Sequence, residues 1–157
     1  MADVTDPFVS FNFQVLLRVA EGASSELTNP LCDAGFAECD GLEMTMEPKT
    51  LREGGNNQSQ IQLVGPVSYG SLTLKRGMTA TLDLWKWFLL STGNEKRALR
   101  ASGVILLCDA AARPTLRYTL YDCLPLKMKA APMNARDGVV AIEEMQLAYR
   151  RFTVEAA

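Results

Sequence analysis

The feature that most constrains this chain of 157 residues is a two-residue alternation of apolar and polar side chains, repeated along most of its length. In residues 8–19, Phe13, Val15 and Leu17 fall on one face, and mostly polar residues fall on the other. This period is typical of a half-buried β-strand. Similar runs recur near residues 36–47, 58–63, 71–75, 115–124 and 139–150, and the continuous apolar run 104–108 suits a strand covered on both faces. The pattern predicts about seven strands.

A segment after residue 78 has helical spacing instead. Apolar residues from Leu82 to Leu89 recur three or four positions apart, and Gly93 is a natural stop. Thr79 or Thr81 can cap the start of this helix. The structural core is expected to include Trp85, Phe88, Leu82 and Phe13, with Lys86 facing solvent. The predicted fold class is mainly β: an antiparallel β-sandwich or barrel of about seven strands with one short α-helix.

The length fits a single domain, 1–157. Residues 20–35 lose the alternation and contain Gly, Ser, Asn and Pro, which predicts a long loop. Pro125 is expected to end the strand at 115–124, so that residues 126–137 form a connection.

The residues of common active sites are missing from the sequence. The chain has no histidine, which removes Ser-His and Cys-His pairs and the commonest metal ligand. Glu143 and Glu144 are adjacent on a predicted strand and therefore point to opposite faces, so they make a poor acid and base pair. The cysteines, which form no CxxC pair and are expected to be buried, reduced thiols, are Cys32, Cys39, Cys108 and Cys123. No catalytic, metal-binding or cofactor-binding residue is predicted, and we do not expect an enzyme.

Charge and hydropathy exclude further classes. The net charge of −2 gives no reason to expect a polyanionic partner. The apolar runs 87–90 and 104–108 are too short to span a bilayer, and the acidic N-terminus is unlike a secretory signal. We expect a protein that has no stable membrane insertion and is released into the cytoplasm of the cell that makes it.

Two charged glycine turns, Arg52-Glu53-Gly54-Gly55 and Lys75-Arg76-Gly77, flank the predicted strand at 58–63. A β protein has open strand edges, which must be covered, charged or paired with another chain. The turns fit an ordinary solvated surface. They fit equally an oligomer in which neighbouring subunits complete one another's sheets and the charged turns set the register between rings.

Six short motifs follow one another in a fixed order: Arg52-Glu53-Gly54-Gly55, Leu63-Val64-Gly65-Pro66, Leu74-Lys75-Arg76-Gly77, Leu84-Trp85-Lys86-Trp87, Leu124-Pro125-Leu126-Lys127 and Val140-Ala141-Ile142-Glu143. Together with Phe36-Ala37-Glu38-Cys39-Asp40-Gly41-Leu42, this order resembles the tail tube (inner tube) proteins of contractile phages and phage-like contractile injection systems. The resemblance covers residues 8–150, which we take as the core of the domain.

The resemblance implies a β-barrel-like fold shared with type VI secretion tube proteins. It also implies hexameric rings that stack into a hollow tube, which a contracting sheath pushes through the target envelope. The implied partners are further copies of the chain, the sheath, the baseplate and spike, and tape-measure proteins, with cargo or DNA in the lumen. The implied location is a phage tail or an injection particle, and such a particle can be released from the cell.

Given this resemblance, we assign seven residues to the contact between subunits or rings: Arg52, Glu53, Gly54, Gly55, Lys75, Arg76 and Gly77. The row Gln58, Gln60 and Gln62 is assigned to the lumen, because it is polar and uncharged. The loop 20–35 and a short C-terminal tail, 151–157, depart from the family pattern. They keep open the alternative of a baseplate-proximal ring that initiates the tube. An alternative of another class is a monomeric β-barrel that binds a small ligand.

Overall fold

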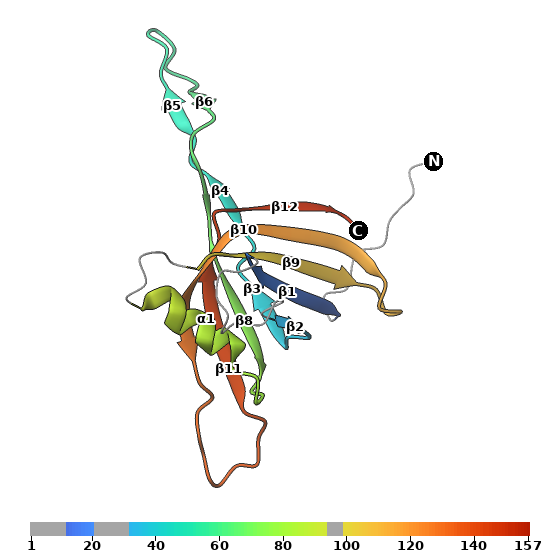
Figure 1. Cartoon of the computed structure of the whole chain (residues 1–157). Helices are drawn as coiled ribbons and strands as arrows, with labels where there is room; N and C mark the ends of the chain where they lie inside the picture. The colour runs from blue at the N-terminus through green and yellow to red at the C-terminus, as the bar shows by residue number, and fades with distance from the viewer. Residues whose placement is uncertain (1–11, 21–31, 94–98) are drawn as a thin grey trace.

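One long strand, β10, takes part in both halves of the fold (Figure 1). The computed structural model describes residues 12–20, 32–93 and 99–157, which form twelve strands and one helix. The elements are β1 (Phe13–Val19), β2 (Cys32–Ala34), β3 (Glu38–Asp40), β4 (Met44–Met46), β5 (Lys49–Leu51), β6 (Ile61–Leu63), β7 (Val67–Tyr69), β8 (Ser71–Gly77), α1 (Asp83–Thr92), β9 (Ala101–Cys108), β10 (Pro114–Lys129), β11 (Ile142–Ala148) and β12 (Arg151–Ala156).

The strands of the body form two sheets that meet at β10. Its first part pairs with β9 and β12, and β9 continues through β1 to β2; we call this half sheet A. Its last part pairs with β11, which is followed by β8 and β3; we call this half sheet B. Every one of these pairings is antiparallel. The mainly β, antiparallel fold class with one short helix is confirmed, as a sandwich that stays open among the described residues.

β10 bends from sheet A into sheet B near Asp122. The register against β9 shifts between Leu120 and Cys123. Asp122 has a φ of 52°, a left-handed conformation that aspartate tolerates better than most residues. Its carboxylate pairs with Nε of Arg150 at 3.1 Å, and the Arg150 N–H donates to the Tyr121 carbonyl at 2.9 Å. The loop that follows β11 therefore fixes the bend.

Several predicted boundaries differ from the structure. β10 continues through Pro125, so the prediction that this residue ends the strand is wrong. The register shifts between Pro125 and Lys127, and such a bulge accommodates a residue that lacks an N–H donor. Residues 151–156, treated as a tail in the sequence, form β12 against β10. Of the predicted loop 20–35, residues 21–31 lie outside the described part of the chain, and Cys32–Ala34 form β2.

The core lies between the two sheets. Val15 and Leu17 from β1 and Leu120 from β10 meet Leu74 from β8 and Leu147 from β11, all at most 1% exposed. The alternation predicted these inward faces. Phe13 is only partly buried and packs against the edge of this core.

The helix buries a different face from the predicted one. Leu84 and Trp87 are buried, whereas Leu82 is 50% exposed, so its assignment to the core is wrong. Leu82 is the residue before the first turn, and neither Thr79 nor Thr81 caps the helix. Trp87 faces inward, where its Nε1 donates to the Leu99 carbonyl at 2.8 Å. Trp85 and Phe88 are half-buried beside it, and Lys86 is exposed as predicted.

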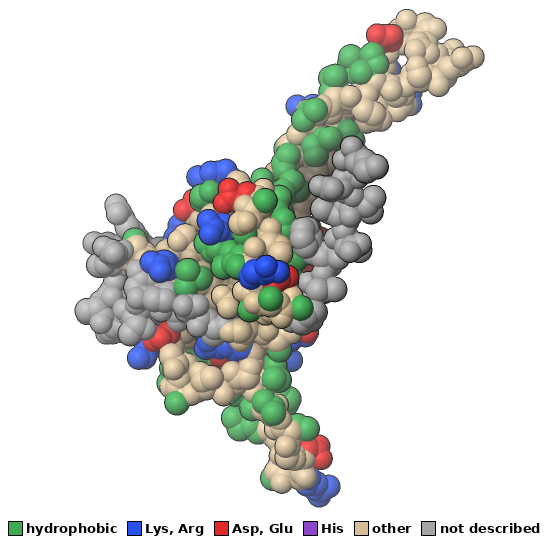
Figure 2. Space-filling model, turned by 90° about the vertical axis from the view of Figure 1, so that its right-hand side faces the viewer, with side chains coloured by type: hydrophobic (Ala, Val, Ile, Leu, Met, Phe, Trp, Pro, Cys, Tyr) green, Lys and Arg blue, Asp and Glu red, His purple; other side chains and the backbone are tan. Residues whose placement is uncertain are grey.

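A narrow arm extends from the body. It consists of two antiparallel pairs in succession, β4 with β7 and β5 with β6, and we call residues 44–69 the arm. In Figures 1 and 2 the arm projects from one end of the body, and the loop of residues 130–141 projects from the opposite end. An isolated two-stranded ribbon is at best marginally stable in water. Beyond its base, no described strand of the body pairs with the arm.

The direction of the arm is set where β3 leads into β4. Gly41 has a φ of 107°, and a Cβ atom at this position would collide with the Ser71 carbonyl. The Tyr149 hydroxyl donates to the Gly41 carbonyl at 2.7 Å and accepts from the Glu43 N–H at 3.2 Å. A buried side chain of the body thus holds the residues that lead into the arm.

We predict that Gly41→Ala destabilises the protein. The backbone strain costs about 1–3 kcal/mol of folding free energy. The collision with the Ser71 carbonyl adds to this loss, because it can be relieved only by moving β4 away from β8. Thermal unfolding of the variant measures the loss. Gly138→Ala is the control, because a Cβ atom there meets open space. Equal midpoints for the two variants would contradict this account of the junction.

Candidate functional site: surfaces at the two ends of the molecule

The two charged turns lie at opposite ends of the molecule. Arg52–Gly55 form the tip of the arm. Lys75–Gly77 end β8, and the next N–H, of Met78, donates to the Ala141 carbonyl at 2.8 Å, beside the projecting loop (Figure 1). Two polar regions at opposite ends can meet when identical copies stack head to tail.

The glutamine row belongs to the arm tip. Gln58 and Gln60 precede β6, Gln62 lies within it, and all three are exposed. With the turn Arg52–Gly55 they line a polar pocket of about 650 Å³. The Gln60 amide, with its oxygen turned toward Arg52, accepts from Nε and Nη2 at 3.2 Å. The structure therefore groups these glutamines with one charged turn and separates them from the other. Their assignment to a lumen stays a prediction.

Arg76 is buried, contrary to the expectation of two exposed charges in the second turn. It is 7% exposed, and its Nε donates to Oε1 of Glu143 at 2.6 Å. The other oxygen, Oε2, accepts from Nε1 of Trp85 at 3.0 Å. The guanidinium also lies over the Phe36 ring, 5.7 Å from its centre. This cluster joins α1 to sheet B, whereas Lys75 remains accessible and pairs with Glu38 at 3.1 Å.

The sequence contained a signal for this buried pair. Arg76 has the same strand parity as Leu72 and Leu74, and Glu143 has the same parity as Met145 and Leu147. A charged residue inside an apolar stripe is almost never buried alone, so two such residues on paired strands predict an ion pair. Glu143 and Glu144 point to opposite faces, as expected.

Exposed apolar side chains gather on both projections (Figure 2). On the arm they are Met44, Met46, Leu51, Ile61, Leu63, Val64 and Val67, each at least 40% exposed. At the loop end Met133 is 90%, Val139 77% and Val140 76% exposed. Sequence reasoning missed these surfaces, since an alternating strand has the same pattern whether its own chain or a neighbour covers it.

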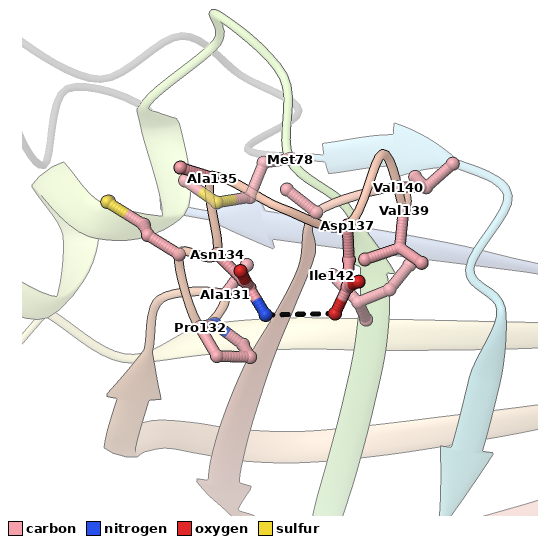
Figure 3. A pocket seen from close by; sticks show the side chains of 11 residues that line it. Met78, Ala131, Pro132, Asn134, Ala135, Asp137, Val139, Val140 and Ile142 are labelled. Atoms are coloured by element: carbon pink, nitrogen blue, oxygen red, sulfur yellow. Dashed lines mark hydrogen bonds between the residues drawn. The ribbon is translucent and has the colours of Figure 1, made fainter.

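The loop end is hollowed (Figure 3). Met78, Ile142 and residues 131–135, 137 and 139–141 line an open pocket of about 520 Å³. Nδ2 of Asn134 donates to Oδ2 of Asp137 at 2.9 Å across the loop. The pocket is mostly apolar and has few polar groups that could orient a small ligand, so it is better suited to apolar side chains of a partner.

The remaining surface of interest is the outward face of sheet B. Opposite the core-facing residues of β8 and β11 lie Thr73, Lys75, Glu144 and Gln146. These side chains are all partly exposed. The face is polar and has a mixture of both charges.

The four cysteines are thiols, and no disulfide joins them. Cys32, Cys108 and Cys123 are buried, as expected, and Cys39 is partly buried. Burial, with Asp40 and Asp122 nearby, raises the pKa of Cys39 and of Cys123 to about 12. In the described part of the chain, no group of three or more potential ligands could hold a metal ion. None of the described helical residues forms a span long and apolar enough to cross a membrane.

Comparison with known proteins defines the class. A family model described as T4-like virus tail tube protein gp19 matches residues 9–153. A chain from the anti-feeding prophage (AFP) baseplate is 28% identical, with a TM-score of 0.79 over 96% of this chain and 97% of that chain. A chain from the PVC sheath-tube complex of an extracellular contractile injection system, in the extended state, is 17% identical, with a TM-score of 0.79 over 98% and 95%. Hcp1 from Salmonella typhimurium is 13% identical, with a TM-score of 0.53 over 92% and 86%. No curated protein matches the chain.

The family match over nearly the whole chain, together with this fold, defines a tail tube protein, whose role is structural and not catalytic. The chain belongs to the T4-like virus tail tube protein gp19 family. The resemblance noted in the sequence is thereby confirmed, and the likeness to Hcp1 extends the shared fold to a type VI secretion system protein.

The buried ion pair gives a stability prediction. Glu143→Gln removes the charge that compensates the buried Arg76 guanidinium, and we expect it to cost about 3–5 kcal/mol. The control is Glu38→Gln, which breaks the exposed pair with Lys75 and should cost no more than about 1 kcal/mol. Urea unfolding of dilute, monomeric protein measures both. Similar losses in the two variants would show that the buried pair does not hold α1 on the sheet.

Proposed function

We propose that this chain is the subunit of an inner tube, in which six copies form a ring and the rings stack into a hollow cylinder. The sheath of a contractile tail or injection system surrounds the cylinder and, on contraction, pushes it through the target envelope. The work comes from the sheath, and the tube supplies a stiff hollow rod. The family assignment favours this function over a monomeric ligand-binding module.

The observation on which the proposal mainly rests is the unsupported arm. Seven apolar side chains of a two-stranded ribbon are exposed in the single chain, which is unfavourable in water. A second apolar surface occupies the opposite end of the molecule. Contact between the arm of one ring and the neighbouring ring buries such surfaces and repeats along an axis without limit.

Within this arrangement, the arm tip lies against the next ring. We assign Arg52, Glu53, Gly54 and Gly55 to that contact, and Gln58, Gln60 and Gln62, which share the tip, to the lumen beside it. Lys75 and Gly77 lie at the end that faces the other way, whereas Arg76 acts inside the subunit. The polar face of sheet B lines the rest of the lumen, where a mixed, hydrophilic surface lets cargo or DNA slide.

The proposed function as an inner tube implies further partners. The sheath contacts the outside of the tube, the baseplate and spike meet its leading end, and a tape-measure protein occupies the lumen during assembly. Two structurally similar chains come from a sheath-tube complex and from a baseplate, which supports the sheath and the baseplate as partners. We expect assembly in the cytoplasm, before the particle is released or fires.

We predict that Leu51→Ser with Ile61→Ser abolishes stacking while leaving the subunit folded. The two residues are partners on β5 and β6, and both are exposed in the single chain. Burial of each contributes about 1.5–3 kcal/mol, so each ring contact should weaken by about a hundredfold or more. Negative-stain electron microscopy of purified protein counts tubes and single rings.

Val154→Ser is the matched control, because Val154 is 52% exposed on β12 of the body, away from the arm. Tubes as long as those of the wild type in the arm variant would contradict the stacking role of the arm. Wild-type protein that stays monomeric at high concentration, with no ring in any preparation, would contradict the tube itself.

A second candidate is the ring that initiates the tube at the baseplate. It is favoured by the identity of 28% with a chain from a baseplate structure, against 17% with a chain from a sheath-tube complex.

Copy number separates the two candidates. An initiator should be present at a single ring per particle, whereas the bulk subunit should rival the sheath in abundance. Quantitative mass spectrometry of purified particles, with the sheath protein as the internal standard, gives the ratio. A ratio near one subunit per sheath subunit excludes the initiator, and a ratio many times smaller excludes the bulk tube.

A further inference from the structure

The strongly exposed methionines of the described chain all lie on its two projections. On the arm, Met44 is 53% and Met46 42% exposed, and at the loop end Met78 is 39% and Met133 90% exposed. An unbranched thioether adapts its shape to a partner better than a branched side chain does, so methionine suits surfaces that must fit another molecule. The same choice of residue leaves four thioethers accessible in the single chain.

On the arm the two thioethers share one face. Met44 and Met46 lie on the same side of β4, and the partner of Met46 on β7 is Val67, which is also exposed. The side chains between them, Thr45 and its partner Ser68, lie on the opposite side, because successive residues of a strand alternate. The base of the arm therefore has one polar face and one apolar face, and both thioethers belong to the apolar one.

At the loop end the other two thioethers line the open pocket (Figure 3). Met78 follows β8, and Met133 belongs to the projecting loop, so the two approach the pocket from different segments of the chain. The side chains around them include Val139, Val140 and Ile142, which are apolar. Both surfaces that the proposed function uses for stacking thus combine aliphatic side chains with a pair of thioethers.

Thioethers differ from aliphatic side chains in their reaction with peroxides. Hydrogen peroxide transfers one oxygen atom to the sulfur: an S–O bond forms, the O–O bond breaks, the sulfur loses two electrons, and the other oxygen leaves as water. The Gly65 N–H donates to the sulfur of Met46 at 3.3 Å, and this weak contact leaves the second lone pair of the sulfur for the oxidant. In the body, Met128 is partly buried and Met145 is 1% exposed, so both should react more slowly.

We propose that Met44, Met46, Met78 and Met133 are sites at which a peroxide modifies the unassembled subunit, and that their sulfoxides prevent stacking. The proposal rests on the proposed tube function, since it needs these surfaces to be covered in the tube. A sulfoxide is polar where the thioether was apolar, and its oxygen would be buried without a donor. Stacking would also shield the sulfur atoms, so the modification excludes damaged subunits before they join and spares the finished tube.

The experiment adds hydrogen peroxide either before or after assembly. Dilute, monomeric wild-type protein is treated, the peroxide is removed, and the protein is then concentrated. Peptide mass spectrometry should find one added oxygen at each of the four exposed methionines and none at Met145. Negative-stain electron microscopy should count fewer tubes by about tenfold or more, since one buried polar group without a partner is sufficient for such a loss. Tubes assembled first should persist and contain less sulfoxide at the four sites.

The decisive variant combines Met44→Leu, Met46→Leu, Met78→Leu and Met133→Leu. Leucine has nearly the volume of methionine and no sulfur, so the variant should form tubes like the wild type and keep forming them after peroxide treatment. The matched control is Met128→Leu, which removes a methionine of the body and should leave the sensitivity to peroxide unchanged. Treatment of the oxidised wild-type subunit with methionine sulfoxide reductases for both epimers should restore assembly.

The outcomes separate the tube function from the modification. Absence of tubes from untreated wild-type protein would overturn the tube function, whereas the peptide map would still test the four sites. Oxidised wild-type subunits that stack normally, or loss of tubes after peroxide treatment in the leucine variant as well, would overturn the role of the sulfoxides alone. Circular dichroism that shows unfolding of the treated wild type would also overturn it, because assembly would then fail through loss of the fold.

Discussion

The bend of β10 is the constraint on which the rest of the structure depends. A strand of sixteen residues supplies ladder partners to three other strands, and it can do so only by leaving one sheet and entering another. Asp122 supplies the left-handed residue at the bend, and Arg150 holds its carboxylate. Since β11 and β12 follow β10 around the same bend, the two sheets are held face to face. The core and the outward polar face of sheet B are consequences of this one change of direction.

The cluster of Arg76, Glu143 and Trp85 has a different role. β8 and β11 form this end of sheet B, and without α1 the core would be open to solvent there. Burial of an ion pair in that position costs free energy, because both charges lose their hydration. It does, however, fix α1 to a single place through directional hydrogen bonds, which apolar packing alone would not do. The rigid end of the subunit is therefore built from polar contacts on an apolar core.

Much of the body could be predicted from the sequence, because alternation reports directly which face of a strand is inward. For this reason, the faces of β1, β8 and β11 that were predicted to point inward are the ones that do so. Alternation does not report what covers the inward face, and this is why Met44 and Met46 look like core residues although no part of the described chain buries them. The helix face differed from the predicted one because Trp85 and Trp87 are equally apolar in the sequence. Their acceptors, Glu143 for Trp85 and the Leu99 carbonyl for Trp87, come from other parts of the chain. The register of β10 against β11 could not be read from the sequence either, since it depends on the bulge at Pro125.

The orientation of the strands in sheet B also has a mechanical meaning. Hydrogen bonds of a ladder lie across the strands, so in a ring whose subunits complete one another's sheets they run around the circumference. Internal pressure or a tightly fitting cargo would load these bonds in tension all around the hoop, where many act together. Thrust along the axis would instead pass along the covalent strands and reach the next ring through the arm. A tube of this design would resist bursting more than it resists being pulled apart ring from ring, and the arm would be the place where it breaks.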